Sequence, residues 1–326
     1  MQNKLLQVKN LKKQFQVAGG MFEKKEFVNA VIDVSFEIKE GTTFSLVGES
    51  GCGKSTTGRL ITRLIDPTSG SITLNGNEVG YLKQSELGDL RETVQMIFQD
   101  PYASLNPRMK VKEIIEEPLI IHTKLSKGER ENLVLEMLNI VGLNTEYANR
   151  YAHEFSGGQR QRIGIARALI TKPKLIIADE PVSALDVSIQ SQILNLLKKL
   201  QQEYQLSYLF ISHDLSVVEH ISHEIGVMYL GSIVEIATKE ALFVNPLHPY
   251  TKALIASVPV ADPLLRRKKE TLKGDIPNPK NPPTGCTFHT RCPIAQELCK
   301  LEVPKMRQIT EQQSVACHFV EKIEEV

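Results

Sequence analysis

The chain has 326 residues, of which 41% are hydrophobic and 24% charged, and its formal net charge at pH 7 is +1. The length predicts about two domains of roughly 150 residues each, and the composition is typical of a soluble globular protein. The small net charge argues against a nucleic-acid-binding protein. Its apolar runs are far shorter than the roughly 20 residues of a membrane-spanning helix. Residues 1–9 also lack the apolar core of a secretion signal, so we expect a cytosolic protein.

The segment before residue 48 predicts a β-rich region. Residues 5–8 are apolar, and residues 34–38 alternate hydrophobic and polar side chains, which is the period-2 pattern of a half-buried strand. Residues 19–26 contain glycines and charges and predict an exposed loop. Phe15 is a candidate for stacking on an adenine ring, with simple packing as the alternative.

A glycine-rich segment at residues 48–55 reads Gly-Glu-Ser-Gly-Cys-Gly-Lys-Ser and stands between a predicted strand at 43–47 and a predicted helix at 56–65. This spacing and these flanks are those of a phosphate-binding loop. Glycines let the backbone approach an anion, and the N–H groups at the helix start point at the phosphates. Lys54 would neutralise phosphate charge, and the Ser55 hydroxyl would bind Mg²⁺. The predicted nucleotide contacts here are Gly48, Glu49, Ser50, Gly51, Cys52, Gly53, Lys54, Ser55 and Thr56.

The next elements are a strand with a tight turn and a second apolar strand. Residues 71–74 followed by Asn75-Gly76 predict the first of these. Residues 91–98 lead into Gln99, whose amide can reach Mg²⁺ or an attacking water from the end of an apolar strand. The alternative is that Gln99 only begins a turn.

Residues 111–151 have a helical pattern. Ser126 and Glu129 form a capping box, and Gly142 ends the helix that follows. We therefore expect a helical insert at about residues 104–165.

Residues 156–159, Ser-Gly-Gly-Gln, precede a helix that runs through Leu169. Free N–H groups and a hydroxyl at a helix start can bind a phosphate. The candidate residues are Ser156, Gly157, Gly158 and Gln159. A chain with one nucleotide needs a second phosphate site only if that site serves a nucleotide held elsewhere.

Two continuous apolar runs, residues 175–178 and 208–211, predict buried parallel strands. The carboxyl ends of such strands are where open α/β sheets bind ligands. After the first run, Asp179 would hold Mg²⁺ and Glu180 would polarise the attacking water. After the second, His213 would contact the γ-phosphate or serve only in structure.

In this order, the motifs resemble those of the ATP-binding subunit of an ABC transporter. The matching segments are Walker A at 48–55, the Q-loop at Gln99, the signature at 156–159, Walker B at 175–180, the D-loop at 183–186 ending in Asp186, and the switch residue His213. Residues 99–108 and 245–251 are similar to the oligopeptide/dipeptide importer branch. Residues 66–70 and 95–99 are similar to the F-type ATPase of those importers.

This resemblance implies an α/β fold: an ABC-type P-loop NTPase core over residues 1–262, with an N-terminal antiparallel β region and an inserted helical subdomain. It also implies ATP hydrolysis by a head-to-tail dimer, in which the signature and Asp186 of one subunit meet ATP held by the Walker A motif of the other. Glu180, His213 and Gln99 would act in hydrolysis. Magnesium ligands would be Ser55, Gln99 and Asp179.

The expected partners are a D-type paralogous ATPase, two membrane permease subunits whose coupling helices dock near Gln99 and, indirectly, an extracytoplasmic substrate-binding protein. The protein would lie peripherally at the cytoplasmic face of the membrane. An ATPase subunit does not touch the cargo, so nickel or another small solute is an alternative to peptides. A soluble ABC-type ATPase that acts as a switch is the alternative from another functional class.

Four of the five cysteines lie in an expected C-terminal extension, residues 263–326, at Cys286, Cys292, Cys299 and Cys317. Thiols in a cytosolic protein favour a metal site over disulfides, and thiolates suit zinc or an iron–sulfur cluster. The spacing lacks the close cysteine pairs of structural zinc sites. It therefore favours a [4Fe–4S] cluster, which the family resemblance also implies, with zinc and a metal-free tail as alternatives. A cluster would stabilise a tail too small for its own core, and the basic run at residues 266–269 predicts a solvated linker.

Overall fold

The computed structural model describes residues 3–17, 26–258 and 274–320. The basic run at residues 266–269 and most of the charged loop expected at residues 19–26 lie outside these ranges.

Twelve strands of the described residues form one sheet. They are β1 (Lys4–Val17), β2 (Glu26–Lys39), β3 (Thr43–Val47), β4 (Ser69–Leu74), β5 (Asn77–Glu78), β6 (Val94–Ile97), β7 (Leu175–Asp179), β8 (Ser207–Ser212), β9 (Glu224–Tyr229), β10 (Ser232–Thr238), β11 (Arg307–Thr310) and β12 (Gln313–Val315). The order is β5-β4-β1-β2-β10-β9-β3-β8-β7-β6, and β12 pairs with both β10 and β11. The strands β6, β7, β8, β3 and β9 run parallel, whereas β1, β2, β4 and β5 pair antiparallel. The sheet is therefore mixed, as the fold class expected.

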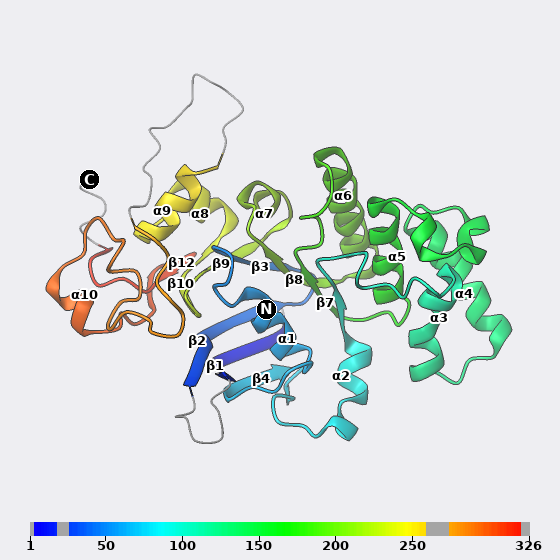
Figure 1. Cartoon of the computed structure of the whole chain (residues 1–326), viewed down its shortest axis with the longest axis horizontal. Coiled ribbons are helices and arrows are strands. Elements are labelled where there is room, and N and C mark those ends of the chain that lie inside the picture. Colours follow the sequence, from blue (N-terminus) through cyan, green and yellow to red (C-terminus); the bar gives the residue numbers. More distant parts are fainter. Residues whose placement is uncertain (1–2, 18–25, 259–273, 321–326) are drawn as a thin grey trace.

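The helices of the described residues cover this sheet and extend from it. They are α1 (Lys54–Ile61), α2 (Gly88–Thr93), α3 (Val111–His122), α4 (Lys127–Ile140), α5 (Gly157–Leu169), α6 (Val187–Tyr204), α7 (Leu215–Ile221), α8 (Lys239–Val244), α9 (Pro249–Ala256) and α10 (Glu297–Leu301). Short 3₁₀ turns lie at Gln84–Glu86, Thr145–Asn149 and Ala152–Glu154. In Figure 1, α3, α4 and α5 form one end of the molecule and the segment with α10, β11 and β12 forms the other, with α1 between them.

The parallel strands are buried because their sequences are apolar throughout. Every residue of β3, β7 and β8 is buried, so these strands need cover on both faces, which is the usual environment of a parallel sheet. Two large hydrophobic clusters supply that cover. Sequence and structure agree on all three strands to within one residue at each end.

The sequence predicts a helix at residues 56–65. The helix found there, α1, spans Lys54–Ile61, so it is shorter than predicted and begins earlier. It ends where Arg63 adopts a left-handed backbone with φ of 55°. The buried Arg63 guanidinium then donates hydrogen bonds to the carbonyls of Val79 and Leu82 and pairs with Asp66. The contacts of Arg63 with the carbonyls of Val79 and Leu82 are long-range, and no local pattern in the sequence predicts them.

The predicted capping box is confirmed in α4. The Ser126 backbone N–H donates to Glu129 Oε2 at 2.7 Å, and the Glu129 N–H donates to Ser126 Oγ at 3.4 Å. Gly142 follows the helix with a φ of 73°, in the left-handed conformation that glycine adopts most easily. The insert boundaries at about 104–165 stay a prediction.

The C-terminal segment is joined to the sheet rather than set apart from it. β12 pairs antiparallel with β10, at Glu235 with Val315 and at Ala237 with Gln313. Phe288 is fully buried in the larger hydrophobic cluster. The boundary expected at residue 262 stays a prediction.

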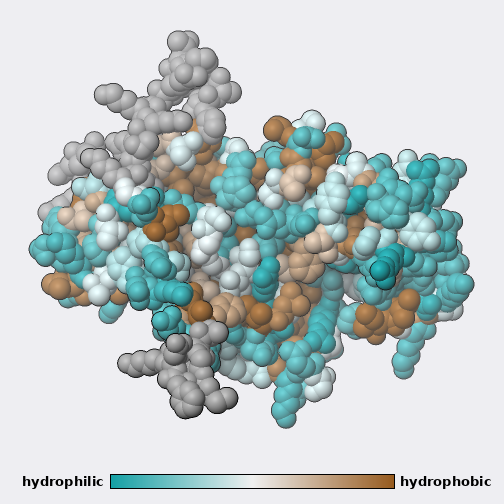
Figure 2. Space-filling view, in the orientation of Figure 1, coloured by the Kyte–Doolittle hydropathy of each residue, from teal (hydrophilic) through white to brown (hydrophobic). Residues whose placement is uncertain are grey.

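The visible surface is mostly hydrophilic, with hydrophobic residues gathered in small separate patches (Figure 2). Among the described residues, every helix is too short or too polar to cross a lipid bilayer.

Candidate ATP-binding site

The loop between β3 and α1 follows a path that only glycine permits at two positions. Gly48 and Gly53 have φ of 150° and 104°. A Cβ atom at Gly48 would lie 2.1 Å from the carbonyl oxygen of Met228, and one at Gly53 would lie 2.3 Å from that of Ala30. Both contacts are far too short, so the loop needs glycine for its close approach to neighbouring backbone.

Lys54, the first residue of α1, turns its side chain back into the loop. Its Nζ donates hydrogen bonds to the carbonyl oxygens of Gly48, at 2.8 Å, and Glu49, at 3.0 Å. The residue is only 4% exposed. The ammonium group therefore lies at the centre of the loop, where a phosphate would be bound.

A cavity of about 450 Å³ lies over this loop. Its lining comes from the loop and α1, from β2 and from the residues that follow β6, β7 and β8: Ala30, Ser50, Gly51, Gly53, Lys54, Ser55, Thr56, Gln99, Glu180 and His213. The fold thus brings together residues from four separate segments that the sequence assigned to one site, namely the phosphate loop with the start of α1, Gln99, Glu180 and His213. Ala30, on β2, is the lining residue that sequence reasoning missed.

Ser55 and Asp179 place two oxygen ligands side by side. Ser55 Oγ donates to Asp179 Oδ1 at 2.7 Å. Asp179 is 3% exposed, and burial raises the pKa of its carboxyl above the ordinary value, although the Ser55 hydrogen bond acts in the opposite direction. A hydroxyl and a carboxylate are ligands that Mg²⁺ accepts, so the chemistry of this pair fits that cation.

Glu180 occupies a backbone conformation that is uncommon for its type. Its φ is 46°, and its N–H donates to the Ile211 carbonyl at 2.9 Å. The side chain is 12% exposed and lies between Gln99 Nε2, 2.9 Å from Oε2, and His213 Nδ1, 3.1 Å from Oε2. Residues with such uncommon backbone conformations cluster at active sites. Here the side chains of Gln99 and His213, the other two predicted catalytic residues, both contact Glu180.

The predicted second anion site lies at the start of α5, away from the cavity lining. Ser156 caps the helix by accepting the Gln159 N–H at 3.4 Å. A Cβ atom at Gly158 would lie 2.5 Å from Ile189 Cγ2 on α6, so glycine permits close helix packing here. Asp186 is exposed at the start of α6. Neither helix start is in the lining of the cavity over the phosphate loop, and the contact of these residues with ATP stays a prediction.

Phe15 lies on β1 with 39% of its surface exposed. The Lys13 ammonium lies 5.0 Å from the centre of its ring. Its stacking on adenine stays a prediction.

The four C-terminal cysteines all lie within the described residues and form no disulfide there. Burial, the largest cause, raises the pKa of Cys286 and Cys292 to about 11 each, and the thiols of the other C-terminal cysteines contribute. Within the described residues, however, no three His, Cys, Asp or Glu side chains are grouped so that they could hold a metal ion. The arrangement of these thiols therefore does not support the predicted iron–sulfur cluster, or a zinc ion.

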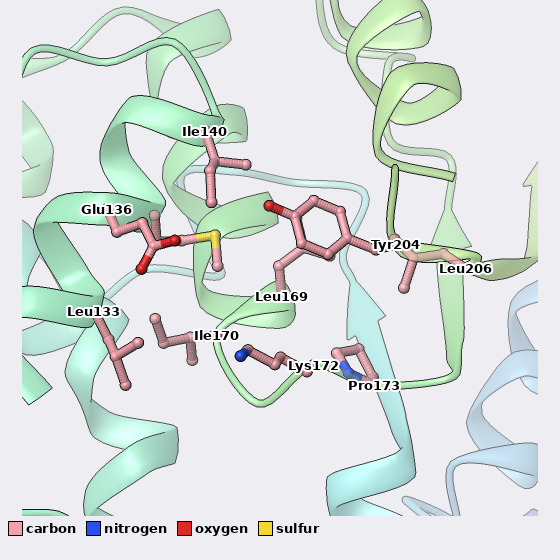
Figure 3. Close-up of a pocket in the computed structure, with 10 residues that line it drawn as sticks. Leu133, Glu136, Ile140, Leu169, Ile170, Lys172, Pro173, Tyr204 and Leu206 are labelled. Atoms are coloured by element: carbon pink, nitrogen blue, oxygen red, sulfur yellow. The ribbon is translucent and has the colours of Figure 1, made fainter. Parts of the chain in front are cut away.

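A second cavity, of about 250 Å³, lies at the opposite end of the parallel strands (Figure 3). Leu133 and Ile140 of α4 lie on one side of it, and Tyr204 and Leu206 on the other. Lys172 and Pro173, which precede β7, complete the wall. The cavity is mainly apolar and is separate from the ATP site.

Comparison with known families matches residues 31–183 to the ABC transporter family and residues 234–299 to the oligopeptide/dipeptide transporter C-terminal region. The oligopeptide transport ATP-binding protein AppF of Bacillus subtilis is 53% identical over 98% of both chains. The chain belongs to the family of oligopeptide/dipeptide ABC transporter ATP-binding proteins. Another family member, the dipeptide transport ATP-binding protein DppF of Escherichia coli, is 50% identical over 99% of this chain and 97% of its own.

The fold comparison agrees with this family. A dimeric post-hydrolysis structure of the ATP-binding cassette MJ0796 with ADP and Pi is 32% identical and has a TM-score of 0.65. It covers 72% of this chain and 99% of its own. The family is one of ATPases, so this chain binds and hydrolyses ATP.

Proposed function

We propose that this ATPase drives the import of oligopeptides or dipeptides through a membrane ABC transporter. The observation that carries the proposal is the full-length similarity to ATP-binding proteins named for oligopeptide and dipeptide transport. The match of residues 234–299 to a C-terminal region specific to such transporters supports it. It also disfavours a soluble ATPase switch.

Within the cavity, the backbone N–H groups of the phosphate loop and Lys54 bind the β- and γ-phosphates. Ser55 and Asp179 would hold Mg²⁺, which would neutralise charge on the phosphates. Glu180 accepts a proton from the attacking water. Gln99 and His213 orient the Glu180 carboxylate, with which both are in contact.

The proposed working unit is a head-to-tail dimer with a D-type paralogous ATPase. The position of residues 156–159 and Asp186 outside the ATP cavity of their own chain supports this arrangement, because these residues can then close over ATP held by the partner. ATP binds the closed dimer preferentially and shifts the population toward it, and hydrolysis releases it.

Two permease subunits would dock beside Gln99, with the protein held peripherally at the cytoplasmic face of the membrane. Exposed apolar side chains after Gln99 and on α3 are available for contact with such subunits. Tyr102 is 57% exposed just after Gln99, and Ile120 and Ile121 on α3 are 56% and 68% exposed. An extracytoplasmic substrate-binding protein would deliver the cargo and set its identity.

The iron–sulfur cluster stays a prediction from the spacing of Cys286, Cys292, Cys299 and Cys317. The proposed function does not depend on it. An iron and acid-labile sulfide assay on protein purified without oxygen tests it directly, with about four irons per chain expected for one cluster.

The proposed function is tested by anaerobic purification of the tagged chain from its native membranes. We expect two permease subunits and a paralogous ATPase to co-purify, and ATP hydrolysis to rise when the binding protein and a peptide are added. A chain recovered alone from the soluble fraction would contradict the proposal. ATP hydrolysis stimulated by a non-peptide solute, and not by a peptide, would show that the cargo is not a peptide.

A further inference from the structure

The C-terminal extension reaches the phosphate loop through one buried arginine. Arg291 Nη1 lies 2.9 Å from Glu49 Oε2, and Arg291 Nη2 lies 3.1 Å from Glu49 Oε1. The Arg291 side chain is 6% exposed and that of Glu49 is 24% exposed. A bidentate pair of this kind is among the stronger and more directional contacts in proteins.

The surrounding residues fix Arg291 in place. The backbone N–H of Arg291 donates a hydrogen bond to the carbonyl oxygen of Phe288 at 3.0 Å. The Phe288 ring packs against Tyr229 and Tyr250, with centroids 5.2 and 5.4 Å away. The Arg291 guanidinium lies 5.9 Å from the centre of the Tyr229 ring. The arginine is therefore held by a packed aromatic cluster and not by a mobile surface.

The same cluster also holds the backbone of Glu49. Tyr250 Oη accepts the Glu49 N–H at 2.9 Å. Glu49 is thus bound at its side chain by Arg291 and at its backbone by Tyr250, while its carbonyl accepts from Lys54. The Glu49 carboxylate also holds the pKa of Arg291 above its ordinary value, which keeps the guanidinium charged.

A carboxylate at the second position of an anion-binding loop is unfavourable unless it is neutralised, because it would repel the phosphates that the loop binds. We propose that Arg291 is a positioning residue for the ATP site, which neutralises Glu49 and holds the phosphate loop in the conformation that binds nucleotide. If the phosphate loop adopts the binding conformation in only a fraction of the molecules, the apparent dissociation constant for the nucleotide rises in inverse proportion to that fraction. The C-terminal extension is therefore part of the ATP site's support.

The inference rests on the ATP site described above and is tested by binding of a non-hydrolysable ATP analogue with Mg²⁺ to the purified full chain, measured by calorimetry. We expect Arg291→Met to weaken binding about tenfold. Adding Glu49→Gln to that variant removes the unpaired carboxylate and should bring the affinity back to within about threefold of the unmutated chain. The loss in Arg291→Met should also shrink at high salt, because salt screens the repulsion.

Arg130→Met is the matched control, since Arg130 forms a comparable ion pair with Glu116 at 2.7 Å in the helical segment. It should leave the affinity for the analogue unchanged. If Arg291→Met does not fold, Arg291→Gln, which keeps hydrogen-bond donors and removes the charge, carries the same expectation. Unchanged affinity in the arginine variant, an equal loss in Arg130→Met, or a double variant as weak as the single one would overturn the proposal. Failure of the unmutated chain to bind the analogue would count instead against the ATP site itself.

Discussion

Glu180 Oε2 lies 3.1 Å from His213 Nδ1, although the two residues follow different strands, β7 and β8. The contact exists because these strands are parallel neighbours, paired at Asp179 with Ile211, so that their carboxyl ends share one sheet edge. Gln99, which follows the next strand β6, donates to the same oxygen at 2.9 Å. Three consecutive strands thus fix the orientation of one carboxylate.

This arrangement predicts the effect of Glu180→Gln. The amide cannot accept a proton from water, and loss of a general base lowers rates by about 10²–10⁴, so we expect hydrolysis by the assembled complex to fall at least about a hundredfold. ATP binding should persist because the phosphate loop is unchanged. Phosphate release and nucleotide binding measure the two effects. Glu203→Gln, on the exposed surface of α6, is the control and should hydrolyse ATP normally, whereas substantial hydrolysis by Glu180→Gln would rule out its role as base.

The buried ammonium of Lys54 predicts a loss of nucleotide affinity in Lys54→Ala. Hydrogen bonds to charged groups contribute roughly 1.5–3 kcal/mol, which corresponds to about a 10- to 100-fold weaker ATP complex. Binding of ATP to the purified variant measures this. Lys127→Ala removes a lysine that is 78% exposed on α4 and should bind ATP like the unmutated chain. Equal affinity in the two variants would contradict the assigned role of Lys54.

The phosphate loop offers a second comparison, between Gly53→Ala and Gly51→Ala. Both glycines have positive φ, but a Cβ atom at Gly53 would collide with the Ala30 carbonyl at 2.3 Å, whereas one at Gly51 would meet nothing within 4 Å. We therefore expect Gly51→Ala to lose only about 1–2 kcal/mol of stability from its left-handed backbone, and Gly53→Ala to lose more. Thermal unfolding of the two variants checks the order. A Gly53→Ala protein as stable as Gly51→Ala would mean that the loop can move away from Ala30.

The meeting of Lys54, Ser55, Gln99, Asp179, Glu180 and His213 was predictable from the sequence because each lies in a recognisable motif or at the end of a predicted strand. Ser55 and Asp179 are 124 positions apart, yet Ser55 lies in the helix after β3 and Asp179 ends β7, and the carboxyl ends of these parallel strands share one sheet edge. Part of β2 was also visible as the period-2 pattern of residues 34–38, and β7 and β8 were visible as continuous apolar runs.

The contacts that the sequence did not reveal are long-range and carry no motif. Glu49 and Arg291 are 242 positions apart, and an arginine in an irregular segment has no periodicity that would point to a partner. The buried Arg63 just after α1 also makes its contacts with Val79 and Leu82 without a motif that would predict them. The spacing of the four cysteines was interpreted as a ligand set, but spacing alone does not fix the side-chain directions that a metal requires.

His248 predicts a loss of stability in acid. It is 1% exposed, burial lowers its pKa to about 3, and its Nδ1 accepts the Tyr250 N–H at 3.1 Å, which requires a neutral ring. In the unfolded chain the pKa of a histidine is about 6.5. As the pH falls from about 6.5 toward 3, His248 therefore binds a proton in the unfolded state but not in the folded state. By linkage, the free energy of unfolding should fall by about 2 kcal/mol between pH 7.5 and 5.

His248→Asn keeps an acceptor at this helix cap and cannot be protonated, so its stability should not contain this fall. The buried Glu235 accepts the His248 N–H, and burial raises its pKa, which acts in the opposite direction in acid. Glu235 is present in both proteins, so the difference between their denaturant-unfolding free energies at pH 7.5 and 5 isolates His248. The exposed His153→Asn should show the same pH dependence as the unmutated chain. A His248→Asn protein that loses as much stability as the unmutated chain over this range would show that His248 is not held neutral by the fold.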